Sequence, residues 1–393
     1  MPHGTMALGR DEALARARRL IPTLRQRAAE GEALRRVPDA TIDDLIASGL
    51  LRLCQPARFG GAELGWDVLC ETSIELGQGD GAQAWVANVY GEHPMFVALF
   101  PDAAQHEVWD DDPDALICAS IIPQGNRATA ADGGYRLSGR WSFTSGVHHA
   151  HWIILGELVG GDPAESRLFL VPRSQFRIDD DWHTIGMVGT GSASVILDEV
   201  LVPAHRTLTQ ADINEGTAPG ARINTAPMYR MPLMGFAQLA LAAVPVGVAI
   251  GMVEDFTRFI GARTGSGKPP AGAELLMERL SEAAAETRAA ALLLLDSART
   301  NAALLAAGKT LGEADAARSM RDGGYAVTMA RRAATRLFEV TGGRGLNLST
   351  PLQRAFRDVI GAAAHGSLGW PRSAMTYAQF VLRAKGDRGF PFL

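Results

Sequence analysis

Residues 139–152 read GRWSFTSGVHHAHW, a stretch that combines aromatic, hydroxyl and histidine side chains. Trp141, Phe143 and Ser145 are separated by single hydroxyl residues. If the stretch is a β-strand, these three side chains share one face. Such a face suits a planar heterocycle, with rings for stacking and a hydroxyl for its polar edge. The alternative, from spacing alone, is a pair of core aromatics in a β domain.

Strand-like runs extend outward from this stretch over about residues 115–207. Gly, Asp and Pro turns separate runs such as LICASII, HWIILGELV and ASVILDEVLVP. These runs do not alternate with helical patterns, which disfavours a parallel doubly wound sheet. A β-barrel or sandwich is expected.

Helical patterns flank the strand-like region on both sides. Residues 12–109 carry apolar side chains at three- and four-residue spacing, and long Ala/Leu-rich amphipathic stretches fill the chain from residue 231 onward. The sequence therefore predicts an α+β architecture. The expected domains are helical over 1–113, β over 114–210 and helical over 211–393.

Composition indicates an ordinary globular protein of 393 residues with a net charge of -5, so no nucleic-acid partner is expected. Three cysteines without CxxC spacing predict no disulfide framework and a cytoplasmic location. No signal-peptide pattern opens the chain. The apolar run over 236–253 is interrupted by Gln238 and Pro245, which predicts a buried core helix and no membrane partner.

Several segments resemble binding or catalytic motifs but lack a required feature. GSGKPP near residue 267 lacks the spacing of a phosphate loop, and GMVGTGS at 186–192 lies between strand-like runs, unlike a dinucleotide fingerprint. No acid or cysteine cluster accompanies His148, His149 and His151, so no metal site is expected. Ser145 has no GxSxG context for a hydrolase nucleophile.

Four segments in order resemble the acyl-CoA dehydrogenase superfamily over nearly the whole chain. They read LIASGLLRLCQPARFGGAELG, YRLSGRWSFTSGVHHAHWIILG, WHTIGMVGTGSASVILDEVLVPAHR and TGGRGLNLSTPLQRAFRDV. The resemblance implies an N-terminal helical domain, a central β-barrel and a C-terminal four-helix bundle, assembled as a homotetramer. Flavin would lie between barrel and bundle.

The chain lacks the carboxylate base that a dehydrogenase of this superfamily needs. No acid follows Arg357 and Asp358 before Asp387, and none occurs in MGFAQLALAA. His365 stands near the first of these positions. With GRWSFTSG followed by HAHW, the chain resembles the oxygenase components of two-component flavin-dependent monooxygenases.

That branch implies a defined chemistry. Reduced flavin, FMNH2 or FADH2, arrives from a separate NAD(P)H-flavin reductase and reacts with O2 to give a C4a-hydroperoxyflavin. This intermediate hydroxylates a phenolic or fused aromatic substrate. The residues that match the branch do not separate FMN from FAD.

The resemblance also assigns roles to catalytic residues. His93 matches the base that deprotonates the phenol, Ser145 matches the residue that bonds flavin N5, and His365 matches the histidine beside the peroxide. Glu92, next to His93, either alters the pKa of that histidine or faces solvent. Ser192 is followed by Ala193 where the branch has Asp or Asn nearby, which bears on substrate identity.

Further positions are implied to bind the cofactor. Trp141, Phe143 and Ser145 would form the flavin wall. Arg263 matches a residue that reaches the flavin phosphates of a neighbouring subunit, and Gly342 and Gly343 match a turn whose backbone approaches the cofactor.

Three other functions stay open. The same fold supports S- or N-oxygenation, which needs no phenol deprotonation, so a fully active His93→Ala protein would favour it. An acyl-CoA dehydrogenase with a relocated base would bleach bound flavin on addition of acyl-CoA. A binding or scaffold protein would hold no flavin.

Overall fold

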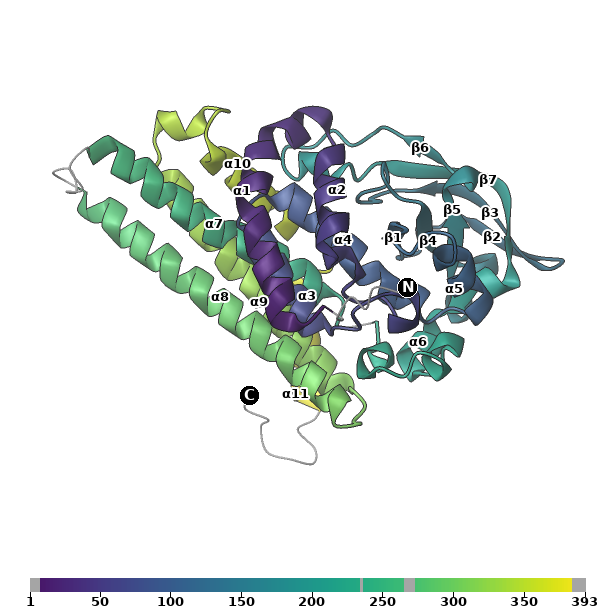
Figure 1. Cartoon of the computed structure of the whole chain (residues 1–393). Helices are drawn as coiled ribbons and strands as arrows, with labels where there is room; N and C mark the ends of the chain where they lie inside the picture. Colours follow the sequence, from purple (N-terminus) through teal and green to yellow (C-terminus); the bar gives the residue numbers. More distant parts are fainter. Residues whose placement is uncertain (1–7, 234–235, 265–272, 384–393) are drawn as a thin grey trace, which may run out of the picture.

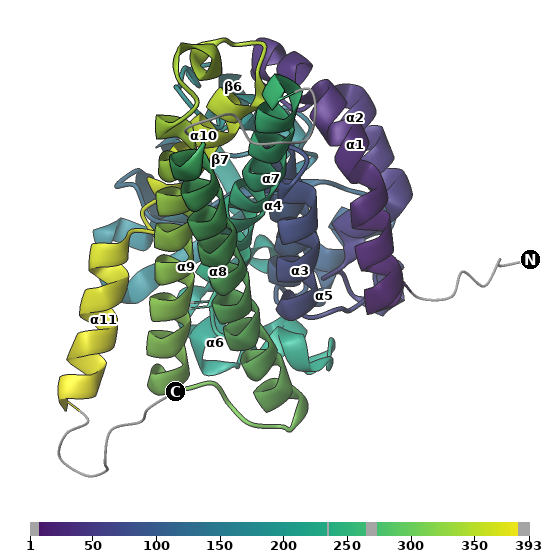
Figure 2. The same cartoon turned by 90° about the vertical axis from the view of Figure 1, so that its left-hand side faces the viewer.

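The computed structural model describes residues 8–233, 236–264 and 273–383. Along the chain, helices precede and follow the strands, and in space the strands lie on one side of the molecule and the long C-terminal helices on the other (Figure 1). The predicted α+β class is confirmed. Helices α3 (Trp66–Gly77) and α4 (Gly81–Val97) lie between these two regions in Figure 1, and Figure 2 shows them beside α7 (Gln238–Thr264), on which both pack directly.

Five helices precede the strands. They are α1 (Arg10–Leu34), α2 (Asp39–Ser48), α3 (Trp66–Gly77), α4 (Gly81–Val97) and α5 (Asp102–Trp109). Every residue of α4 is buried, which fits its position between other elements and its lack of a polar face. The Asp80 side chain caps α4 by accepting from the Gln83 N–H at 2.9 Å.

The strands pair into two four-stranded sheets. One has the order β1 (Ile117–Ser120), β4 (Trp152–Leu158), β5 (Ser166–Pro172) and β8 (Thr207–Thr209). The other has the order β2 (Arg127–Ala131), β3 (Gly134–Trp141), β7 (Ser194–Pro203) and β6 (Arg177–Asp179). Only β1 and β4 pair in parallel among these described strands.

A closed barrel is not confirmed, because no strand pairing among the described residues links the two sheets. A side-chain bond does join them. The Trp141 indole N–H at the end of β3 donates to the carbonyl of Gly156 on β4 at 3.1 Å. Trp141 is fully buried and belongs to the hydrophobic core.

Helices again form the C-terminal part. They are α6 (Gln210–Glu215), α7 (Gln238–Thr264), α8 (Glu274–Ala306), α9 (Glu313–Glu339), α10 (Pro351–Ala363) and α11 (Trp370–Arg383). Helices α7 to α10 pack together and α11 packs on α9, as predicted for a C-terminal helical domain. A side chain at Gly324 would lie 2.5 Å from the Ser373 hydroxyl, so glycine permits the close contact of α9 with α11.

Two of the described helices, Gln238–Gly261 and Glu274–Ala306, are long and apolar enough to cross a membrane. The first is 72% buried inside the protein, as predicted for a core helix. Helix α8 is less covered and leaves Leu275, Met277 and Leu292 exposed.

Candidate active site

The strand β3 ends at Trp141, and residues 142–151 form bends and turns. Phe143 has a φ of 63°, which breaks the extended backbone directly after the strand. The prediction that Trp141, Phe143 and Ser145 share one strand face is therefore wrong. Trp141 is 0% exposed in the core, whereas Phe143 is 68% exposed.

The two aromatic residues consequently have different surroundings. Trp141 is enclosed between the sheets and offers no exposed ring to a ligand. Phe143 meets the edge of Trp182, with ring centroids 6.1 Å apart and planes at 84°. Of the predicted aromatic wall, only Phe143 remains open to solvent.

A helix–turn contact places Ser145. The Tyr90 hydroxyl of α4 donates to the carbonyl of Gly146. Gly146 has a φ of 78°, and a side chain there would lie 2.8 Å from the Tyr90 hydroxyl oxygen. Glycine at 146 is thus required for both the turn and its close approach to α4.

Ser145 lies in a line of hydroxyl groups. The Trp85 indole N–H donates to Ser145 Oγ at 3.1 Å, and Ser145 Oγ is 2.8 Å from Ser192 Oγ. Ser192 Oγ is 2.7 Å from Thr190 Oγ1, which donates to the Met187 carbonyl at 2.8 Å. Trp85, Thr190 and Ser192 were not among the predicted site residues, although GMVGTGS stood out in the sequence.

His365 approaches the same tryptophan from the opposite end of the chain. It follows α10, and its ring centroid lies 5.7 Å from that of Trp85. Burial lowers the pKa of His365, so the ring is neutral near pH 7. The Ser367 N–H donates to His365 Nδ1 at 3.3 Å, which leaves the ring proton on Nε2 as a donor.

His93 lies on the face of α4 that also carries Trp85 and Val89, because these residues are spaced by four. Its Nδ1 is 2.9 Å from the Ile117 carbonyl of β1 and must carry the proton. Nε2 therefore holds the lone pair. Burial lowers the pKa of His93 to about 4 against the opposing effect of the Ile117 carbonyl.

Glu92 faces a different direction from His93. It is buried, and burial raises its pKa to about 8. Burial raises the pKa values of the Cys54 and Cys70 thiols, and the Glu92 carboxyl raises them further. The pKa of His93 depends on burial and on Ile117, so neither alternative offered for Glu92 holds.

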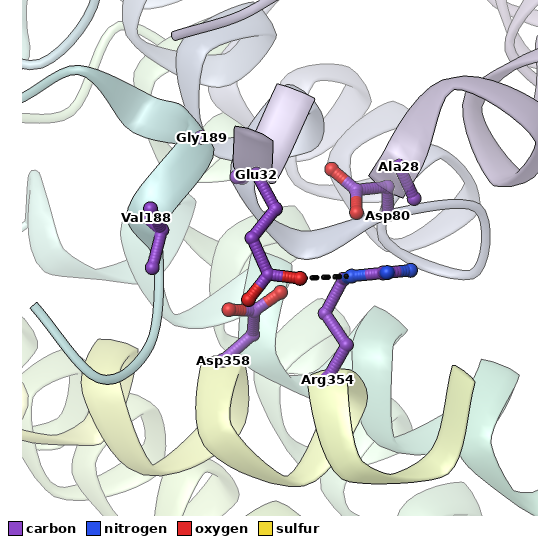
Figure 3. Close-up of a pocket in the computed structure, with 8 residues that line it drawn as sticks. Ala28, Glu32, Asp80, Val188, Gly189, Arg354 and Asp358 are labelled. Carbon is purple, nitrogen blue, oxygen red and sulfur yellow. Dashed lines mark hydrogen bonds and ion pairs between the residues drawn. The ribbon is translucent and has the colours of Figure 1, made fainter. Parts of the chain in front are cut away.

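A small pocket lies where α1, α4 and α10 meet the 186–192 loop (Figure 3). Glu32 binds Arg354 at 2.9 Å, and Asp80 and Asp358 face the same hollow. Asp358 accepts the Met187 N–H at 2.6 Å. Burial and the Asp80 carboxyl raise the pKa of Asp358. Asp358, which follows Arg357 in the segment that resembles the superfamily, thus bonds the 186–192 loop to α10.

The remaining cofactor positions lie elsewhere. Gly342, with a φ of 64°, and Gly343 are exposed at the start of the short helix η10 (Gly343–Leu346). Their backbone is open to a ligand. Arg263 is in the last turn of α7, and its side chain lies outside the described residues.

Two of the three neighbouring histidines bond to separate partners. His149 Nε2 is 2.8 Å from an Asp39 carboxylate oxygen, and His151 Nδ1 accepts the Leu116 N–H at 3.0 Å. In the described part of the chain, no three His, Cys, Asp or Glu side chains are arranged to hold a metal ion.

The residues around Ser145 suit a flavin. A hydroxyl oxygen, an imidazole N–H and the exposed ring of Phe143 offer the polar and flat contacts that an isoalloxazine needs. Ser145 comes from the turn after β3 and His365 from the segment after α10, and Trp85 of α4 contacts both, so only the folded chain brings them together.

Comparison with known proteins shows the family of the chain. Residues 239–370 match the family model for the acyl-CoA dehydrogenase C-terminal domain. The chain is 38% identical over 375 residues to the FADH(2)-dependent resorcinol hydroxylase oxygenase component of Rhizobium sp., covering 91% of each protein.

Solved structures give the same result over the whole fold. The 3-HSA hydroxylase from Rhodococcus sp. RHA1 superposes with a TM-score of 0.91 at 34% identity, covering 95% of this chain and 98% of that one. XiaF from Streptomyces sp., in complex with FADH2 and glycerol, has a TM-score of 0.85 at 26% identity and covers 98% of both chains.

Proposed function

The chain belongs to the oxygenase components of flavin-dependent monooxygenases, in the acyl-CoA dehydrogenase superfamily, and we propose that it hydroxylates a phenolic or fused aromatic substrate. As an enzyme of this family it uses reduced flavin and O2. Reduced flavin, when bound, supplies the electrons that activate O2 for transfer of one oxygen atom.

The convergence of Ser145 and His365 on Trp85 carries the proposal. Ser145 accepts from the indole at 3.1 Å, and the His365 ring lies 5.7 Å from the indole ring. One hydroxyl and one imidazole thus lie next to the same indole, and the exposed Phe143 precedes Ser145 by two residues. Ser145 would bond the flavin ring, and His365 would donate a hydrogen bond to bound oxygen.

His93 would act as the base for the substrate hydroxyl. A pKa of about 4 keeps the ring neutral at pH 7, with a lone pair on Nε2. A phenolate beside the ring would raise this pKa, because an opposite charge stabilises the imidazolium. Removal of the phenol proton raises electron density at the ring carbons that receive oxygen.

FADH2 is the flavin we propose, because both relatives described above whose names specify a flavin specify FADH2. The exposed backbone of Gly342 and Gly343 and the side chain of Arg263 would bind the part of the cofactor beyond the ring. A separate NAD(P)H-dependent reductase would supply the reduced flavin, in the cytoplasm.

The domain division at residues 113 and 210 belongs to the proposal, as does a barrel-like arrangement of the two sheets around Trp141. So does a homotetramer. The exposed Leu275, Met277 and Leu292 support subunit contacts along α8, because this helix is only partly covered within the protein.

A coupled assay tests the function. The purified protein is mixed with FADH2 from a flavin reductase, O2 and a panel of phenols, with catalase present to remove free peroxide. We expect a hydroxylated product only when the protein is present. Oxidation of FADH2 without any hydroxylated phenol, together with flavin bleaching by an acyl-CoA, would instead identify a dehydrogenase.

A further inference from the structure

We infer that Ser192 and Thr190 are positioning residues that fix Ser145 Oγ as a hydrogen-bond acceptor, so that the site selects reduced over oxidised flavin. The inference rests on the proposed function, because it takes Ser145 as the residue that bonds flavin N5. The inference assigns the preference for reduced over oxidised flavin to two residues that need not contact the cofactor.

The direction of the hydrogen bonds follows from the two ends of the line. The Trp85 indole N–H can only donate, and the Met187 carbonyl can only accept. Thr190 gives its single hydroxyl proton to Met187, so it must accept from Ser192. Ser192 therefore accepts from Ser145, 2.8 Å away.

The Ser145 hydroxyl can then only accept a hydrogen bond from a ligand. Its proton is committed to Ser192, and one of its two lone pairs receives the Trp85 N–H. The other lone pair can accept one further hydrogen bond. A ligand atom beside Ser145 Oγ must accordingly be a donor.

The Met187 end of this line of hydroxyl groups is fixed by further hydrogen bonds. Met187 has its N–H bonded to Asp358 at 2.6 Å, and its carbonyl also accepts the Trp182 indole N–H at 3.0 Å. Thr190 and Ser192 are 2% and 5% exposed, so water does not compete for their hydroxyl groups. Reversal of the line would remove the Thr190 hydroxyl bond to the Met187 carbonyl, which would keep only the Trp182 indole N–H and the Thr190 backbone N–H as donors.

The two redox states of flavin differ at the relevant atom. N5 of reduced flavin carries a hydrogen and can donate to Ser145, whereas N5 of oxidised flavin has only a lone pair. An acceptor facing an acceptor loses one hydrogen bond and adds repulsion, which is worth about tenfold in Kd. Product flavin would leave for the same reason.

Binding measurements on the full chain test this inference without turnover. Kd values for FADH2 (anaerobic) and for FAD are measured by fluorescence titration for the wild type, Ser192→Ala and Thr190→Val. Either substitution frees the Ser145 proton to donate to oxidised N5. Thr184→Val is the control, because its hydroxyl bonds the Gly186 carbonyl in the same loop but lies outside the line.

The expected result is a ratio of Kd for FAD to Kd for FADH2 that falls about tenfold in Ser192→Ala and Thr190→Val. The fall should come from tighter FAD binding, with Thr184→Val like the wild type. An unchanged ratio, including equal weakening of both flavins, would overturn the inference alone. A wild type that binds neither flavin would refute the proposed function as well.

Discussion

At the residue scale, the proposed chemistry depends on two neutral histidines, His93 of α4 and His365 after α10. His93 lies on the face of α4 that carries Trp85, and its lone pair is on Nε2. His365 instead has its proton on Nε2. One ring can take a proton and the other can donate a hydrogen bond at the same pH. That pairing suits removal of a phenol proton beside a developing negative oxygen.

Replacement of His93 by Gln tests the first of these roles. Glutamine can keep the bond to the Ile117 carbonyl but cannot accept the phenol proton. We expect kcat for phenol hydroxylation to fall by about 10²–10⁴-fold, with Kd for FADH2 unchanged. Stopped-flow product formation measures the loss. Full activity of the variant would favour S- or N-oxygenation.

The buried carboxyl of Glu92 is predicted to destabilise the folded protein as the pH rises from 4.5 to about 8. Its pKa of about 8 in the folded protein exceeds the ordinary value of 4.5, so the folded state binds more protons between these values. Stability then falls as pH rises through this window. Glu92→Gln should raise the free energy of unfolding by about 4 kcal/mol at pH 8 and change it little at pH 4.5.

Urea denaturation at the two pH values provides the measurement, with exposed Glu30→Gln as the control. A Glu92→Gln variant that is equally destabilised at both values would show that the carboxyl has a partner that the amide cannot replace.

At the element scale, α10 holds the loop that carries Ser192. Asp358 accepts the Met187 N–H, while Arg354 and Arg357 of the same helix pair with Glu32 of α1 at 2.9 and 2.5 Å. Through these bonds, one helix ties the loop to the N-terminal helices. The position of Ser192 therefore depends on the contact of this loop with α10.

Removal of the Asp358 acceptor should loosen this loop. Asp358→Ala leaves the buried Met187 N–H unpaired, at a cost of about 1–3 kcal/mol in unfolding free energy. Asp358→Asn keeps an acceptor oxygen and resembles the protonated acid, so it should cost much less. Equal losses in the two variants, measured by urea denaturation, would contradict the acceptor role.

The sequence predicted elements better than the local path of the chain. The helical ends, the strand-rich middle and the buried helix around Pro245 follow from periodicity and length, and they are confirmed. The alternation through Trp141 and Phe143 failed, because residue spacing does not reveal a positive φ at Phe143. Pairing of the strands into two sheets depends on contacts distant in sequence.

The site shows the same limit. The resemblance led to His93, Ser145 and His365, and the structure brings Ser145 and His365 to one tryptophan. Trp85 and Thr190 were missed because an indole in an apolar helix and a threonine between glycines look structural. Only the distances between side chains reveal the line of hydrogen bonds.

At the scale of the whole molecule, the exposed apolar side chains of α8 predict assembly. Leu292 is 51% exposed on a helix that is only partly covered. Leu292→Glu should shift a homotetramer toward smaller species, because an isolated charge in an apolar interface is costly. Sedimentation velocity measures the shift, and Ile122→Glu, at an exposed apolar position after β1, is the control.

A Leu292→Glu protein that sediments like the wild type would place the subunit contacts elsewhere.

The central claim is that one atom of O2 enters an aromatic substrate at the Ser145–His365 site. Mass spectrometry of the product formed from FADH2, a phenol and ¹⁸O2 tests it most directly. The account predicts one ¹⁸O atom in each hydroxylated product, in the presence of catalase and only with the protein. Product that takes its oxygen from water, or oxidation of FADH2 without any hydroxylated phenol, would contradict it.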